Sequence, residues 1–447
     1  MIPNTLVNNT LNHLEGPSYI EERFSSDPTW VLKERLDAWE RFSALAMPTR
    51  KDEQWRFATV NRTLLDEVEL AMPNEGLLKA STELPAAREA LMHFHFVDDV
   101  LVTEPEMPEA LVRQGVIISS LKDALIHHEA AIRPWLFQNT TELGSGKFEY
   151  LHRALVSNGL FVFVPKNVEV SGHIAATYEV TGERTASFPH TLVVAQDHAR
   201  VQILDSYLTA SDAQGSYVSA SAHVHVDQGA RVERTAIQNT NISTNLFQLD
   251  SGFVSRDAEF QSTAINLGGK KARYENQVSI EGSGSNAKMY ALTVADGKQE
   301  FDQRTFQTHT APNTFSDLLY KNALMDQART VFSGLIRVGD DAQQTDAYQT
   351  NRNILLDASA EANSLPGLEI SANDVKCSHG ATTGKLSEEE LFYFLQRGIP
   401  PRIAKHLMVT GFLEEVTEKM RPSALRAAQN LPSRTWGHPL SSFLAFR

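Results

Sequence analysis

The chain contains a single cysteine, Cys377, and a histidine, His379, lies two residues after it. Residues two apart in a β-strand project from the same face, so one partner could meet the thiol and the imidazole together. A thiol beside an imidazole can be an activated nucleophile, but no oxyanion-hole loop and no third orienting residue accompany this pair. A structural cysteine is the alternative. With one cysteine, a disulfide framework and a self-contained four-cysteine zinc or iron–sulfur site are both excluded.

The segment that follows the pair, Gly380–Leu386, resembles a phosphate-binding loop at first sight. A P-loop has four residues between its glycines and a Ser or Thr after its lysine, whereas this segment has three residues there and a leucine. Leu267–Lys271 is also lysine-rich, but it lacks the first glycine. The sequence therefore predicts that any ATP-driven step is supplied by a partner.

Two further groups of histidines could bind a metal in principle. His127 and His128 precede Glu129, but neighbouring residues on a helix diverge, unlike the ligands one turn apart in His-Glu-x-x-His zinc enzymes. A solvated helix face is therefore favoured for them. His223 and His225 point to the same side of one predicted strand, where such a pair more often lines a sheet surface than chelates a metal.

Composition restricts the class of protein. The 447 residues include 41 basic and 55 acidic side chains, a net charge of −14, which argues against general nucleic-acid binding and against binding to anionic membranes. No apolar run approaches the length of a transmembrane helix. The start, Met1–Thr5, lacks the basic and apolar parts of a secretory signal. We therefore expect a cytoplasmic protein with no nucleic-acid or membrane partner.

Residues 1–150 are predicted to form a helix-rich N-terminal region. Asp27 and Pro28 have the residue types of a helix start, and proline is tolerated at the first helical position. The predicted elements are a helix from Asp27 to Pro48, strands at His93–Val97 and Gly115–Ile118, and a helix from Leu121 to Trp135.

Residues 151–384 are predicted to form a β-rich core. From Leu151 to Ile370, short β-branched and apolar runs recur between Gly, Asn, Asp and Ser. The clearest runs are Leu160–Val164, Thr191–Val194, Val201–Leu204 and Ala222–Val226.

A weak repeat runs through this core. A polar residue or glycine is followed by alanine, a charged residue and an apolar residue, and the four alanines are 31, 28 and 29 positions apart (Ala199, Ala230, Ala258 and Ala287). A near-constant period in a strand-rich segment favours a stacked solenoid, here a parallel β-helix. A β-sandwich with regularly spaced hairpins is the alternative, although the hairpin dipeptides Asn-Gly and Asp-Gly are sparse in the core.

Residues 385–447 are predicted to form a small helical C-terminal domain. Ser387 and Glu390 have the spacing of a capping box, and Gly398 ends the first helix. A second helix is predicted through Ile403 towards Val416, and a last one near Pro422. Cys377 and His379 thus lie where the β-rich core meets the helices, and such a junction is a plausible interface.

The junction and several upstream segments resemble the SufB/SufD family of iron–sulfur cluster assembly proteins. The likeness covers most of the chain and rests on Asp374–Gly384, Glu390–Ile399, Ala328–Gly334 and Gln349–Leu356, and more faintly on Pro48–Arg56. It is closer to SufD than to SufB. SufB typically reads Glu-His-Glu-Ala here and has a scaffold cysteine further upstream, whereas His379 is flanked by Ser378 and Gly380 and no upstream cysteine exists.

The resemblance implies a right-handed parallel β-helix between helical regions and a non-enzymatic scaffold subunit. It implies a complex with SufB and two copies of the ATPase SufC, which supports iron–sulfur cluster assembly and iron acquisition. SufB would pair through the β-helix ends, and the C-terminal helical domain would dock SufC. In SufD proteins, the histidine that matches His379 is implicated in cluster formation at the SufB interface, with the cysteine that matches Cys377 beside it.

The number of ligands agrees with this division of labour. Clusters are held by several thiolates, sometimes with histidine in place of cysteine, and Cys377 and His379 supply two ligands at most. We therefore expect a transient cluster shared with SufB and no cluster stably bound to the isolated chain. A flavin in the assembled complex is left open. The isolated chain is expected to form a homodimer through unpaired strand edges.

Two other functions compete with this interpretation. The first is a structural β-helix interaction module in which His379 has no ligand role. The second is a carbohydrate-active β-helix enzyme, which would need a groove of paired carboxylates and usually a secretory signal.

Overall fold

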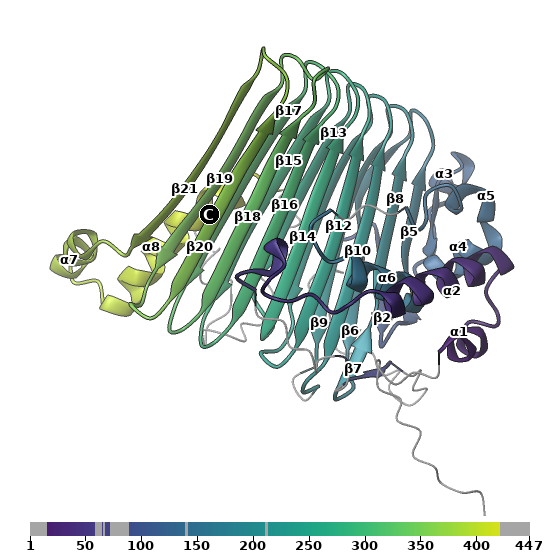
Figure 1. The fold of residues 1–447 in the computed structure, drawn as a ribbon, viewed down its shortest axis with the longest axis horizontal. Coiled ribbons are helices and arrows are strands. Elements are labelled where there is room, and N and C mark those ends of the chain that lie inside the picture. The colour runs from purple at the N-terminus through teal and green to yellow at the C-terminus, as the bar shows by residue number, and fades with distance from the viewer. Residues whose placement is uncertain are drawn as a thin grey trace, which may run out of the picture.

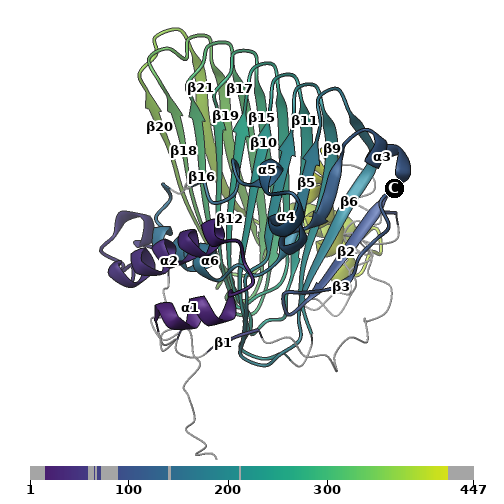
Figure 2. The same cartoon turned by 90° about the vertical axis from the view of Figure 1, so that its right-hand side faces the viewer.

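A computed structural model describes residues 16–58, 65, 68–71, 89–138, 142–210 and 213–420. Most of them form one parallel β-solenoid, in which two large sheets face each other (Figures 1 and 2). Successive core strands alternate between the sheets, so each pairs with the strand two places away in the chain. This confirms the predicted parallel β-helix with helices on both sides of it in the sequence, and it excludes the β-sandwich of hairpins.

The first sheet is sheet A, which holds the even-numbered strands from β8 onward. Its strands are β1 (Glu69–Leu70), β4 (Ile117–Ser120), β5 (Gly159–Val164), β7 (Thr185–Ser187), β8 (His190–Ala195), β10 (Tyr217–Val226), β12 (Asn245–Val254), β14 (Lys271–Ile280), β16 (Glu300–His309), β18 (Arg329–Val338) and β20 (Glu361–Ile370). They follow the order β20-β18-β16-β14-β12-β10-β8-β5-β4, with β7 beside β10 and β1 beside β7.

The second sheet is sheet B, which holds the odd-numbered strands from β9 onward. Its strands are β2 (Met92–Val97), β3 (Val100–Thr103), β6 (Glu169–Val180), β9 (Arg200–Thr209), β11 (Arg231–Asn239), β13 (Glu259–Asn266), β15 (Asn286–Ala295), β17 (Phe315–Leu324), β19 (Asp346–Leu355) and β21 (Lys376–Lys385). Their order is β21-β19-β17-β15-β13-β11-β9-β6-β2-β3. Pairing is parallel throughout the core, and only the β2–β3 and β4–β5 pairs are antiparallel among the described strands.

The helices lie at the two ends of the solenoid and over its outer faces (Figure 1). They are α1 (Pro17–Arg23), α2 (Thr29–Ala44), the 3₁₀ turn η1 (Glu53–Trp55), α3 (Glu109–Arg113), α4 (Leu121–His127), α5 (Glu129–Ile132), α6 (Gly146–Leu155), α7 (Glu388–Gln396) and α8 (Pro401–Thr417). None of the helices within the described residues has the length and apolar character needed to cross a membrane.

Side chains alternate between the interior of the solenoid and its outer faces, as the period of a β-strand requires. On β10, Val218, Ala220 and Val224 lie in the large interior core cluster. The interior becomes polar toward the C-terminal strands. On β19, Gln349, Asn351 and Asn353 occupy interior positions and are buried.

The corners between sheet A and sheet B explain the sequence repeat. His198, Gly229 and Asp257 each adopt a positive φ at the corner, and the alanine after each of them is fully buried. The fourth repeat was assigned two residues too late. Glu259 pairs with Asn286, so the corner residue of that coil is Gly284, with a φ of +76°, and Ser285 takes the place of the alanine. The corner selects a residue that tolerates the left-handed region, and glycine does so without strain.

The N-terminal region is more mixed than predicted. The strand expected at His93–Val97 is β2, which pairs with β6 in sheet B, and the one expected at Gly115–Ile118 is β4, shifted toward Ser120. Four strands from before residue 151, β1 to β4, thus belong to the two sheets.

The boundaries of three predicted helical or β segments were wrong. The helix expected from Asp27 begins at Thr29 and ends at Ala44, because the Asp27 carboxylate pairs with Arg35 at 2.8 Å and does not cap the helix. The helix expected at Leu121–Trp135 is broken at His128 into α4 and α5. Leu151–Leu155, expected in the β-rich core, belongs to helix α6.

The C-terminal helices differ in how they are attached. Ser387 caps α7 as predicted, accepting a hydrogen bond from the backbone N–H of Glu390 at 3.2 Å. Helix α8 packs on sheet B, where Val409, Leu413 and Val416 share a buried cluster with strands β15 and β17. The helix predicted near Pro422 lies outside the described residues.

Candidate functional site at the open end of the solenoid

The solenoid ends in strands β20 and β21, which are the last strands of sheets A and B (Figure 1). Each pairs with one neighbour in its sheet, and no further described strand covers its outer edge. The backbone N–H and C=O groups along such an edge are free to pair with another chain. Both predicted site residues, Cys377 and His379, lie on β21.

Cys377 points into the space between the two sheets. It packs against a small buried cluster that includes Ile336 and Val338 from sheet A and Ala347 from sheet B. His379, two residues further along the strand, therefore faces the same interior. Their Cα atoms are about 6.6 Å apart on an extended strand, and this spacing lets both side chains approach one ligand from the same side. Both residues lie on one strand, as the predicted same-face arrangement requires.

The environments of the two side chains differ. Cys377 is partly buried, and burial raises the pKa of its thiol, so the protonated form predominates at neutral pH in the chain alone. His379 is exposed, whereas Gln349, the residue opposite it on β19, is buried. The difference arises because another coil covers Gln349 and none covers His379. A thiol and an imidazole are thus presented at a surface that lacks its next layer.

The glycine-containing segment after His379 is not a phosphate-binding loop. Residues Gly380–Lys385 continue strand β21 in parallel register with β19. A P-loop needs a turn that wraps its backbone N–H groups around a phosphate and leads into a helix, and an extended strand supplies neither.

The other two histidine groups lie on helix α4 with the residue after it and on strand β10. His127 is exposed and lies 3.6 Å from Asp123, on the solvated helix face that was expected. His223 and His225 are buried on β10, where the His223 ring contacts His190 edge-on and the His225 ring stacks on Phe253. Within the described residues, no three His, Cys, Asp or Glu side chains are grouped to hold a metal ion.

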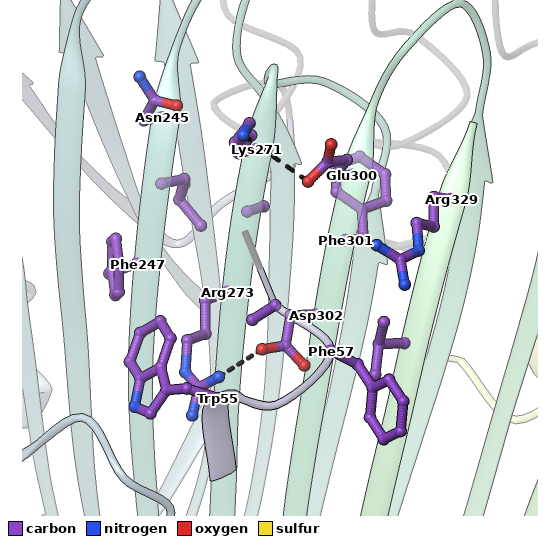
Figure 3. Close-up of a pocket in the computed structure, with 14 residues that line it drawn as sticks. Trp55, Phe57, Asn245, Phe247, Lys271, Arg273, Glu300, Phe301, Asp302 and Arg329 are labelled. Carbon is purple, nitrogen blue, oxygen red and sulfur yellow. Dashed lines mark hydrogen bonds and ion pairs between the residues drawn. The ribbon is translucent and has the colours of Figure 1, made fainter. Parts of the chain in front are cut away.

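A small cavity of about 60 Å³ on the outer face of sheet A was not expected from the sequence (Figure 3). The segment around Trp55 covers it. The Arg273 guanidinium stacks 3.7 Å from the Trp55 ring, donates to the carbonyl oxygen of Gln54 at 3.1 Å and pairs with Asp302. The Trp55 indole N–H donates to the carbonyl oxygen of Gly144 at 2.9 Å. Arg273 therefore fastens the N-terminal segment to the sheet.

The charges around this cavity are balanced. Lys271 lies 3.7 Å from Glu300, and Arg329 lies 3.4 Å from Glu361. Since Arg273 is also paired, the cavity offers no excess positive charge to an anionic ligand. Its sequence signal was the tryptophan in Pro48–Arg56, and its role in the structure is to anchor that segment.

Comparisons with known proteins agree with this fold. A family model described as "SUF system FeS cluster assembly, SufBD core domain" matches residues 178–412, and one described as "SufBD protein N-terminal region" matches residues 20–175. The iron–sulfur cluster assembly SufBD family protein slr0076 of Synechocystis is 27% identical over 412 residues, which cover 89% of each chain.

Two proteins named SufD are similar over nearly their whole length. The iron–sulfur cluster assembly protein SufD of Bacillus subtilis is 25% identical over 88% of this chain and 91% of its own. That of Escherichia coli is 28% identical over 86% of this chain and 90% of its own. The core-domain match alone spans more than half of the sequence. The chain therefore belongs to the SufBD family of the SUF iron–sulfur cluster assembly system.

Proposed function

We propose that this chain is the SufD-like subunit of a cytoplasmic SUF scaffold complex, which pairs with a SufB-like protein and a SufC-like ATPase. Its family membership supports a role in iron–sulfur cluster assembly. The observation that carries the proposal is the placement of Cys377 and His379 on one face of the last strand, at an open end of the solenoid. A partner that docks on this end meets both groups at once.

The open end has the properties of a docking surface for another β-solenoid. Strands β20 and β21 present free backbone edges, and Leu365 and Ile370 on β20 are exposed apolar side chains. A strand edge pairs most readily with another strand edge, because each then satisfies the other's backbone groups. We propose that the SufB-like partner continues the stack from this end. A second copy of this chain would use the same edges when the partner is absent.

A cluster bound here would be cargo shared between two chains. Cys377 and His379 supply two ligands at most, and iron–sulfur clusters need more, so the partner contributes the remainder. Neutral imidazole is a good iron ligand and can also carry a proton during sulfur transfer. The Cys377 thiol, whose pKa is raised by burial, loses its proton most readily when iron is already near. His379 is therefore the primary ligand and Cys377 the auxiliary one.

The ATPase is proposed to dock on helix α7. Phe392 is 58% exposed and Tyr393 is 54% exposed, and no residue of α7 is buried. An uncovered helix with large apolar side chains marks a protein–protein contact. Helix α8, in contrast, is fixed to sheet B, where Lys321 donates to the carbonyl oxygen of Phe412 at 2.8 Å. Helix α7 therefore presents the contact, and α8 ties it to the solenoid.

The cluster proposal is tested by single substitutions in the co-expressed complex. His379→Ala should lower the cluster content several-fold at unchanged subunit stoichiometry, and Cys377→Ser should have a milder effect. Ser378→Ala is the matched control, because Ser378 lies between them on the opposite face of β21. The measurement is iron and sulfide content after anaerobic purification. Undiminished content in His379→Ala would exclude a ligand role and leave the structural-module interpretation.

The docking proposal is tested by a paired substitution on α7. Phe392→Ala with Tyr393→Ala should weaken capture of the ATPase at least tenfold, while thermal unfolding is unchanged because both side chains are exposed. Ile403→Ala on α8 is the control, since Ile403 is an exposed apolar side chain of the same C-terminal region outside α7. Retained capture by the α7 variant would contradict the assignment of α7.

A further inference from the structure

The interior of the solenoid just below its open end contains a buried amide with an unsatisfied oxygen. Gln349 on β19 is 1% exposed, and its Nε2 donates across the core to the carbonyl oxygen of Gly334 at 3.3 Å. Its Oε1 has no hydrogen-bond partner among the described residues. Leaving a buried carbonyl oxygen without a donor is unfavourable, because the water lost on burial is not replaced.

The path of this amide depends on the glycine opposite it. A Cβ at position 334 would lie 2.4 Å from Oε1 of Gln349 and 2.7 Å from Oγ1 of Thr305. The amide therefore crosses the interior only because residue 334 has no side chain. Thr305 does not satisfy the amide oxygen, since its own hydroxyl also has no partner within the described residues.

The other interior polar side chains of β19 have hydrogen-bond partners on β20 and β21, the strands of the last coil. Asn353 donates from Nδ2 to Oγ1 of Thr383 at 3.1 Å, and Thr383 is its register neighbour on β21. Asn351 accepts from the Ser364 hydroxyl on β20 at 2.6 Å. Gln349 is the remaining interior polar residue of this strand. Its register neighbour on β21 is His379.

We propose that Gln349 is a positioning residue for His379. The two side chains are not hydrogen-bonded in the structure; the exposed imidazole turns about its side-chain bonds so that one ring N–H donates to Oε1 of Gln349, and the other ring nitrogen then keeps its lone pair and faces the open end. Histidines that bind metals are commonly held by such an acceptor, which fixes the tautomer and the ring orientation. The iron-binding part of this inference rests on the proposed function, whereas the inferred hydrogen bond needs no residue from another chain.

The hydrogen bond is tested on the isolated full chain by nitrogen-15 NMR of histidine-labelled protein at pH 8. The His379 signal is identified by its loss in His379→Ala. We expect one tautomer in the unmodified chain, both tautomers in Gln349→Met, and one again in Gln349→Glu, which keeps an acceptor. Gln303→Met is the control, because it removes an equally buried amide on β16 whose partners are Thr293 and Asn322.

The control variant and the assembled complex distinguish failure of the hydrogen-bond inference from failure of the proposed function. A His379 spectrum in Gln349→Met identical to that of the unmodified chain would overturn the inference, and so would an equal change in Gln303→Met. If Gln349→Glu fails to fold, these two methionine variants still decide. In the assembled complex, Gln349→Met should weaken iron binding about tenfold. A changed tautomer together with undiminished clusters in His379→Ala would refute the proposed function and leave the hydrogen bond established.

Discussion

The stability of the solenoid should depend on one buried cation in its interior. The side chain of Arg234 on β11 is 1% exposed and lies 2.7 Å from a carboxylate oxygen of Asp205 and 2.8 Å from one of Asp250. Its third contact is the Tyr207 hydroxyl at 3.1 Å. Arg234→Met keeps much of the side-chain volume but leaves two carboxylates without their cation. Breaking a buried ion pair in this way costs about 3–5 kcal/mol at neutral pH.

The loss should shrink as the pH falls. Burial raises the pKa of Asp205 above its usual range even with Arg234 beside it, and without that cation the shift grows. A carboxyl with a folded-state pKa above its unfolded value destabilises the protein at high pH. The penalty disappears as the pH falls through the folded-state pKa, at up to about 1.4 kcal/mol per pH unit for each proton taken up. The variant should therefore lose less stability at pH 5 than at pH 8.

Urea denaturation followed by circular dichroism, at pH 5 and at pH 8, measures both effects. The matched control removes all three charges together, as Asp205→Asn, Arg234→Met and Asp250→Asn. Replacing a whole buried ionic group by neutral side chains is often close to neutral, so this control should be more stable than Arg234→Met and nearly independent of pH. An equal loss in Arg234→Met at both pH values, or a control no more stable than the single variant, would refute the reasoning.

Two further substitutions test the packing that positions the site. Gly159→Ala should lower the unfolding temperature measured by differential scanning calorimetry, because the new Cβ would lie 1.8 Å from the backbone oxygen of His190 on the neighbouring strand; an unchanged temperature would contradict that close approach. Leu413→Ala should cost about 2–5 kcal/mol in urea denaturation, since this α8 side chain is 1% exposed against sheet B. A negligible loss would mean that α8 does not share the core of the solenoid.

The repeating part of the fold could be predicted because its signal is local. Each coil contributes a period-two strand and a corner residue, and both are visible within a few positions of sequence. The repeat failed where the corner changed its residue types. Gly284 and Ser285 occupy the positions held by His198 and Ala199 three coils earlier. Because this corner has serine in place of alanine, the repeat was wrongly placed on the next alanine, Ala287. Serine fits the corner as well as alanine does, because both are small.

The N-terminal attachment could not be predicted because it joins distant positions. Arg273 contacts Gln54, which is 219 residues away in the chain, and no local sequence pattern predicts that contact. The same limit applied to β2, which was predicted as a strand although its pairing with β6 was not. Local residue types determine that a segment is extended. Which strand it joins depends on contacts between residues far apart in the chain. Forming those contacts costs loop-closure entropy, which is offset only when the whole core folds.

The candidate site shows the same division. That Cys377 and His379 share a face followed from their spacing alone. That Gln349 lies opposite His379 did not, because the register between β19 and β21 is set by the lengths of two corners and of β20. The family resemblance indicated His379 as a candidate site residue, and the structure shows which residues lie next to it.

An open stack explains why the site and the docking surface coincide. Two interior amides of β19 gain a partner from the coil that follows: Asn353 from Thr383, and Asn351 from Ser364. The last coil has no successor among the described strands, so its interior side chains and its backbone edges are left unsatisfied together. A partner that completes the strand pairing necessarily covers Cys377 and His379. If a cluster is held between two chains, as proposed above, assembly of the interface and assembly of the ligand set would be one event.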